Sequence, residues 1–143
     1  MNPDLADLIK YRFERAHGAL RQAEALLKLD ELDGAMNRMY YSMFYAVLAL
    51  LATRQLGSSR HTGVIALFHR EFVKTGCFPK EVARSLDEAF DQRLNGDYRD
   101  FYMPERKQLD LLLEKTKTFV AQAENIIESG SWAKYGSPPD SQR

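Results

Sequence analysis

The sequence predicts an all-α protein, an up-and-down bundle of four main helices with one or two short extra helices between the second and the last. Apolar residues recur every three or four positions over long stretches, and no stretch of useful length alternates as a strand does. Glycine, asparagine and proline divide the chain into segments of helix length. The 143 residues suit one domain, expected over residues 1–129. Residues 130–143, rich in Ser, Gly and Pro, are expected to form a flexible tail.

The first two predicted helices differ in character. Residues 3–29 place leucine, alanine and isoleucine on one face with Asp and Arg between them, the pattern of an amphipathic helix. Residues 35–56 carry almost no charge, and both faces are apolar or small. Such a helix lies either at the centre of a bundle or under a partner subunit. Arg38 is its exception, because a buried guanidinium requires a carboxylate or several other acceptors.

The rest of the chain predicts two shorter helices and a long final one. A helix over residues 62–75 stops at a glycine, and Pro79 opens the next. Asn95-Gly96 has the composition of a left-handed helix end, which places Arg93 in the last turn. Pro104 suits the first turn of the final helix.

The composition excludes several classes of protein. Twenty basic and twenty acidic residues balance, so contact with nucleic acid must come from a local constellation and not from the overall field. No apolar run reaches the roughly 20 residues that span a bilayer, and the N-terminal residues do not resemble a signal peptide. We therefore expect a cytoplasmic protein without membrane contact.

No metal site or cofactor is expected. The single cysteine, Cys77, excludes an internal disulfide and any CxxC pair. Glu14-x-x-His17 matches half of a di-iron signature, but that site needs the motif twice.

Three polar motifs carry a resemblance to a known family. They are Asn37-Arg38-Met39-Tyr40-Tyr41, Ser59-Arg60-His61-Thr62-Gly63-Val64 and Arg93-Leu94-Asn95-Gly96-Asp97-Tyr98. Over residues 5–127 the chain resembles the HEPN (higher eukaryotes and prokaryotes nucleotide-binding) domain family. The resemblance implies a homodimeric helical bundle with a nucleotide or single-stranded RNA as ligand. It also implies a minimal nucleotidyltransferase as the partner in a toxin–antitoxin pair.

The ribonucleases of this family carry an Arg-x4-6-His motif in a cleft between subunits. Arg93 matches the arginine, but Tyr98, Arg99 and Asp100 occupy the positions where the histidine would follow. The chain resembles a branch with Arg-x3-Asp-Tyr instead. Without the imidazole, the site lacks the side chain whose pKa best suits proton transfer near neutrality. We therefore assign no catalytic residue and expect binding and partner assembly without the usual ribonuclease activity.

The candidate groove for a ligand or partner combines residues from the motifs. Its members are Asn37, Arg38, Tyr41, Arg93, Asp97 and Tyr98, with Arg60, His61 and Tyr102 as weaker candidates. Arg93 and Asp97 allow three interpretations: an ion pair at a helix end, a ligand site, or a polar cluster in which Asp97 meets Arg38. The third is the most economical. Tyrosines at helical spacing are more often core or interface residues than a platform for bases.

Two alternatives to a binding function stay open. The first is a metal-independent ribonuclease that uses Arg93 with His61 as a substitute base. The second is a structural adaptor whose polar cluster only specifies packing. The resemblance further implies adenylylation of a tyrosine by the partner, for which Tyr98 or Tyr102 is the candidate. A homodimer is expected to use the alanine and tyrosine face of the second helix.

Overall fold

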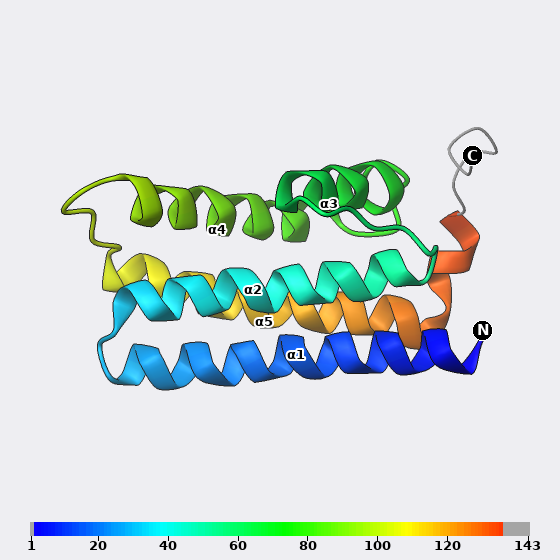
Figure 1. Cartoon of the computed structure of the whole chain (residues 1–143), viewed down its shortest axis with the longest axis horizontal. Helices are drawn as coiled ribbons and strands as arrows, with labels where there is room; N and C mark the ends of the chain where they lie inside the picture. Colours follow the sequence, from blue (N-terminus) through cyan, green and yellow to red (C-terminus); the bar gives the residue numbers. More distant parts are fainter. Residues whose placement is uncertain (1, 136–143) are drawn as a thin grey trace.

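The computed structural model describes residues 2–135, without the side chains of Asp97 and Tyr98, and contains no strand within that range. Its helices pack as one bundle (Figure 1). The elements are α1 (Pro3–Lys28), α2 (Leu32–Ala52), α3 (His61–Phe68), the π-helical turn η1 (His69–Val73), α4 (Lys80–Tyr98), α5 (Arg106–Ser129) and the 3-10 turn η2 (Ser131–Tyr135). The all-α prediction, with four main helices and short pieces between the second and the last, is confirmed. None of the described helices is long and apolar enough to cross a bilayer.

Helix α2 lies at the centre of the bundle and packs against α1, α3, α4 and α5 (Figure 1). Ala35, Ala46 and Ala49 are fully buried within the subunit, and Ser42 donates a hydrogen bond to the Ala16 carbonyl of α1 at 2.8 Å. Small residues on both helices let α1 and α2 approach closely. The central position therefore explains the uncharged faces of α2. The alanine part of the predicted homodimer contact is wrong, because these alanines are already covered.

Helix α4 extends further than the sequence indicates. It continues through Asn95 and Gly96 to Tyr98, so the predicted left-handed end is wrong. Arg93 lies more than one turn before the end of the helix. A Cβ at Gly96 would come within 3.0 Å of the Met36 Cε atom, so this glycine permits a close approach between α4 and α2.

Two other helix starts differ by a few residues. Helix α5 begins after its N-cap residue Glu105, so Pro104 precedes the helix instead of lying in its first turn. Helix α2 begins at Leu32, which places Gly34 inside its first turn.

The predicted helix over residues 62–75 corresponds to α3 and η1 together, followed by Gly76 in the left-handed conformation (φ 85°). The π-helical turn carries the buried carboxylate of Glu71, which is 1% exposed. Its Oε1 lies 3.8 Å from Nη1 of Arg54, and Arg70 donates to its Oε2 at 3.0 Å. A buried charge with cations on both oxygens is a structural ion-pair network. No spacing or motif in the sequence indicates this network.

The network also contacts the segment that follows α5. Arg54 donates to the Trp132 carbonyl at 3.0 Å, and η2 packs against η1 and the end of α5. Residues 131–135 of the predicted tail thus form a packed turn. Residues 136–143, where the tail is also expected, lie outside the part of the chain that the structure describes.

Candidate functional site

Three tyrosines of α2 form a row of rings. The ring centroids of Tyr40 and Tyr41 are 5.1 Å apart, and those of Tyr41 and Tyr45 are 6.0 Å apart. Tyr40 is fully buried and also contacts Phe90 of α4. Tyr41 and Tyr45 are half-buried. Tyr40 is therefore a core residue, whereas the other two rings are partly open to solvent.

Two arginines from different helices lie against the ring of Tyr41. The Cζ atom of Arg38 is 5.0 Å from the ring centroid, and that of Arg93 in α4 is 5.4 Å from it. Arg93 also donates to the Tyr41 hydroxyl at 3.4 Å. A cation over an aromatic face is stabilised by about 0.5–2 kcal/mol, depending on desolvation. We call Arg38, Tyr41 and Arg93 the Tyr41 cluster. It unites three of the predicted groove residues.

Neutral groups satisfy the guanidinium of Arg38. Its Nη2 donates to the Asn37 side-chain oxygen at 3.0 Å, and its Nη1 donates to the Gln22 side-chain oxygen at 3.3 Å. Among the described side chains, no carboxylate lies within ion-pair distance of Arg38. Amide oxygens accept hydrogen bonds without cancelling the charge. The predicted contact with Asp97, like the role of Tyr98, concerns side chains outside those described and stays a prediction.

Arg15 of α1 extends this polar surface. Its Nη2 donates to the Tyr45 hydroxyl at 2.8 Å, and its Cζ atom is 5.0 Å from the Tyr45 ring centroid. A cavity of about 220 Å³ between α1 and α2 is lined by Arg15, Arg38, Tyr45 and Gln22, together with Glu14, Gly18 and Ala19. We call it the Arg15 pocket. Arg15 and Gln22 were missed because nothing in their spacing distinguishes them from other polar residues of α1.

His61 at the start of α3 contacts the same rings. Its Nδ1 lies 2.9 Å from the Tyr40 hydroxyl, and its ring stacks on Phe44 at 4.3 Å. Burial, and then the charge of Arg93, lower the pKa of His61, while burial raises the pKa of Tyr40. A neutral imidazole and a protonated phenol are therefore the stable forms near neutral pH. His61 and Arg93 are far apart in sequence but share contacts with Tyr40 and Tyr41.

The other two weaker candidates lie elsewhere. Arg60 is the exposed N-cap residue of α3, and its backbone N–H donates to the Ser58 hydroxyl. Tyr102, in the connection between α4 and α5, donates to the Gln92 side-chain oxygen. Neither residue has a described contact with the Tyr41 cluster.

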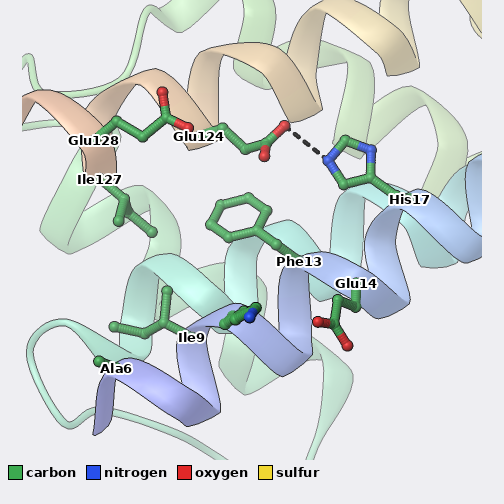
Figure 2. A pocket seen from close by; sticks show the side chains of 9 residues that line it. Ala6, Ile9, Phe13, Glu14, His17, Glu124, Ile127 and Glu128 are labelled. Carbon is green, nitrogen blue, oxygen red and sulfur yellow. Dashed lines mark hydrogen bonds and ion pairs between the residues drawn. The ribbon is translucent and has the colours of Figure 1, made fainter. Parts of the chain in front are cut away.

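A second cavity, of about 400 Å³, lies between α1 and α5 (Figure 2). Ile9, Phe13 and Ile127 give it an apolar lining. His17 pairs with Glu124 at 2.8 Å, and the Glu14 side chain points away from that pair (Figure 2). The side chains of Glu14 and His17, which match half of the di-iron signature, therefore do not point toward a common metal position. Across the described residues, no group of three His, Cys, Asp or Glu side chains could hold a metal ion.

Comparisons with known proteins give one family model and several similar proteins. Residues 9–132 match the model of the HEPN domain. A Thermotoga maritima protein named "UPF0332 protein" is 40% identical over 85% of this chain and 92% of its own length. Two Methanocaldococcus jannaschii proteins are also similar. "Putative toxin MJ0142" is 33% identical over 81% of this chain and 79% of its own length. "Putative toxin MJ0605" is 26% identical over 90% of this chain and 95% of its own length.

Proposed function

The chain belongs to the HEPN domain family, and we propose that it acts by binding single-stranded RNA or a nucleotide at the Tyr41 cluster. The placement of Arg38 and Arg93 against the ring of Tyr41 carries this proposal. A guanidinium presents a planar set of donors that matches phosphate oxygens, and an aromatic face stacks on a base. The cluster thus offers both groups that a nucleotide needs.

Single-stranded RNA fits this surface better than a duplex. A protein with balanced charge has no net positive field of the kind that attracts a duplex. Unstacked bases are available to tyrosine rings only in loops, ends and single strands. A local site of two arginines and half-buried tyrosines suits that kind of ligand.

The relatives named as toxins support a place in a toxin–antitoxin assembly. In this proposal the chain belongs to the HEPN branch with Arg-x3-Asp-Tyr in place of the ribonuclease motif, and its partner is a minimal nucleotidyltransferase. Tyr98 or Tyr102 is the candidate tyrosine for adenylylation by that partner. A homodimer would have to use surfaces other than the buried alanines of α2.

The hydrogen bond between Tyr40 and His61 favours binding over cleavage. The Tyr40 hydroxyl is buried, and Nδ1 of His61 is its hydrogen-bond partner among the described residues. When Tyr40 donates this bond, the neutral imidazole carries its proton on Nε2. His61 then acts as a donor toward a phosphate oxygen and not as a base.

Cleavage of RNA is the second candidate function, and the position of His61 beside the rings that hold Arg93 supports it. Here His61 donates from Nδ1 to Tyr40, and the lone pair on Nε2 accepts the proton of the ribose 2′-hydroxyl as its oxygen attacks the adjacent phosphorus. The bond from phosphorus to the 5′-oxygen breaks, and that oxygen takes the proton from the imidazolium. Arg93 stabilises the negative charge on the phosphate. This function requires the opposite tautomer of His61.

Binding of a fluorescently labelled single-stranded octanucleotide RNA, followed by anisotropy, tests the main proposal. We expect Arg38→Gln and Arg93→Gln each to weaken binding by about tenfold or more, because a charge-assisted hydrogen bond contributes about 1.5–3 kcal/mol. Arg84→Gln is the matched control, since Arg84 is an exposed arginine of α4 paired with Glu81. Absence of binding by the wild type, or equal weakening in all three variants, would overturn the proposal.

Incubation of the same RNA for hours separates the two candidates. Fragments that form with the wild type, and disappear with both Arg93→Gln and His61→Gln, would establish cleavage. RNA that stays intact while binding persists would leave binding as the function.

A further inference from the structure

We propose that the Arg15 pocket is a second phosphate subsite, which holds the backbone of the RNA strand beyond the nucleotide on the Tyr41 cluster. This inference rests on the proposed RNA binding and adds a second point of contact. The ligand group is a phosphodiester of a single-stranded polynucleotide.

The pocket holds two positive charges that no carboxylate among the described residues pairs with. Other arginines of the protein do pair with carboxylates. Arg15 and Arg38 both line it, and neither lies within ion-pair distance of a carboxylate among the described residues. Glu14 lines the pocket but lies beyond that distance. By contrast, Arg106 contacts both Asp30 and Asp110. Two guanidinium groups beside one cavity repel each other, and an anion between them would relieve that repulsion.

Neighbouring side chains hold both guanidinium groups in place. Arg15 donates to the hydroxyl of Tyr45, and Arg38 donates to the side-chain oxygens of Asn37 and Gln22. A guanidinium has five N–H donors, so each arginine keeps donors for the oxygens of a phosphate. Arginines that are already positioned lose less conformational entropy when the ligand binds.

A glycine of α1 keeps the pocket open. Gly18 lines the cavity, and a Cβ atom added there would meet only Nη2 of Arg21, at 3.7 Å. That distance is an ordinary van der Waals contact. The fold therefore accommodates a Cβ atom at this position, and we expect a longer side chain to occupy the pocket. Glycine inside a helix lowers stability relative to most other residues, so helix stability does not explain a glycine at position 18.

The pocket is continuous with the Tyr41 cluster. Arg93 lies 5.4 Å from the Tyr41 ring centroid, the Tyr41 and Tyr45 centroids are 6.0 Å apart, and Arg15 lies 5.0 Å from the Tyr45 centroid. Arg38 belongs to both places, because it lies over Tyr41 and lines the pocket. Along this row a strand can stack bases on the two half-buried rings while its phosphates meet the arginines.

The experiment compares a labelled octanucleotide RNA with a labelled dinucleotide over a series of salt concentrations. We expect Arg15→Gln to weaken octanucleotide binding by about tenfold and to reduce the slope of log K against log salt by about 0.7, the value for one lost contact to a single strand. The dinucleotide, which reaches only the Tyr41 cluster, should bind the variant as it binds the wild type.

Gly18→Leu provides a second variant that leaves every charge in place. It should weaken octanucleotide binding while the melting temperature stays the same or rises. Arg84→Gln should change neither affinity nor slope. Octanucleotide binding that is lost in Arg38→Gln but unchanged in both Arg15→Gln and Gly18→Leu would overturn the subsite alone. Failure of the wild type to bind the octanucleotide would overturn the proposed function, and the subsite with it.

Discussion

The arginines near the two ends of α2 have opposite surroundings. Beyond its C-terminal end, the side chain of Arg54 is 8% exposed and lies 3.8 Å from the Glu71 carboxylate. In its N-terminal half, Arg38 is half-buried and meets amide oxygens and an aromatic ring. Arg15 of α1, which lies against the middle of α2, is held by the hydroxyl and the ring of Tyr45.

The role of an arginine is therefore indicated more clearly by the group that contacts its guanidinium than by how deeply the side chain is buried. In the Arg54 network, the carboxylate of Glu71 neutralises the guanidinium charge, so little positive potential remains to attract a ligand. The network connects the end of α2 with η1 and η2. Neutral acceptors position a guanidinium but preserve its charge, which an anion can then use. This difference separates a structural region from a candidate binding region, and four predictions test it.

The largest effect is expected from removal of the carboxylate in the structural region. Glu71→Gln should lower the free energy of unfolding by about 3–5 kcal/mol, because it leaves Arg54 buried without its carboxylate. Urea denaturation monitored by circular dichroism measures this change. The double variant Arg54→Met/Glu71→Gln should recover much of the loss, since both charges are then absent. A loss below about 1 kcal/mol in Glu71→Gln would remove the distinction between the two regions.

The next effect concerns the binding region. Tyr41→Leu should weaken RNA binding by about 1–3 kcal/mol, the contribution of one base stacked on an aromatic side chain. Tyr41→Phe keeps the ring and loses only a long hydrogen bond from Arg93, so it should lose about 0.5 kcal/mol. Anisotropy titrations measure both variants. Equal affinities of Tyr41→Leu and the wild type would show that the ring does not stack on a base.

The sequence predicted the parts of this comparison that lie within single helices. Apolar periodicity located the main helices, the motif around Arg38 and Tyr41 supplied two of the three residues of the Tyr41 cluster, and a second motif supplied Arg93. Gly96 was misjudged because its role depends on Met36 of another helix, which no local pattern reveals. A glycine that permits close packing and a glycine that ends a helix have the same local composition.

The contacts between distant segments could not be predicted for the same reason. Glu71 lies in a π-helical turn, where the side-chain periodicity of an α-helix no longer indicates the buried face. Arg15 resembles the other polar residues of an amphipathic helix until the packing of α1 on α2 brings it to Tyr45. The approach of His61 to the rings beside Arg93 likewise follows from the placement of α3 and not from sequence spacing.

A smaller effect on stability is expected for a substitution of Arg38 than for one of Glu71. This difference tests whether the binding region and the structural region are distinct. Arg38→Gln should change the free energy of unfolding by less than about 1 kcal/mol, because the arginine is half-buried and leaves only amide oxygens without a donor. The same urea experiment measures it. A loss of about 3 kcal/mol or more would indicate that Arg38 neutralises a buried carboxylate, as the predicted contact with Asp97 requires. The binding region would then resemble the structural one.

The smallest effect is a dependence of stability on pH at His61. Burial and the charge of Arg93 lower the pKa of this imidazole in the folded protein below its ordinary value of about 6.5. As pH falls below about 6.5, the unfolded chain takes up a proton more readily than the folded protein, so folding stability decreases. The free energy of unfolding of the wild type minus that of His61→Gln should therefore be constant above about pH 7 and should fall toward pH 5. A difference that instead grows on acidification would mean that a carboxylate stabilises the imidazolium, and the positive field proposed for the binding region would be absent there.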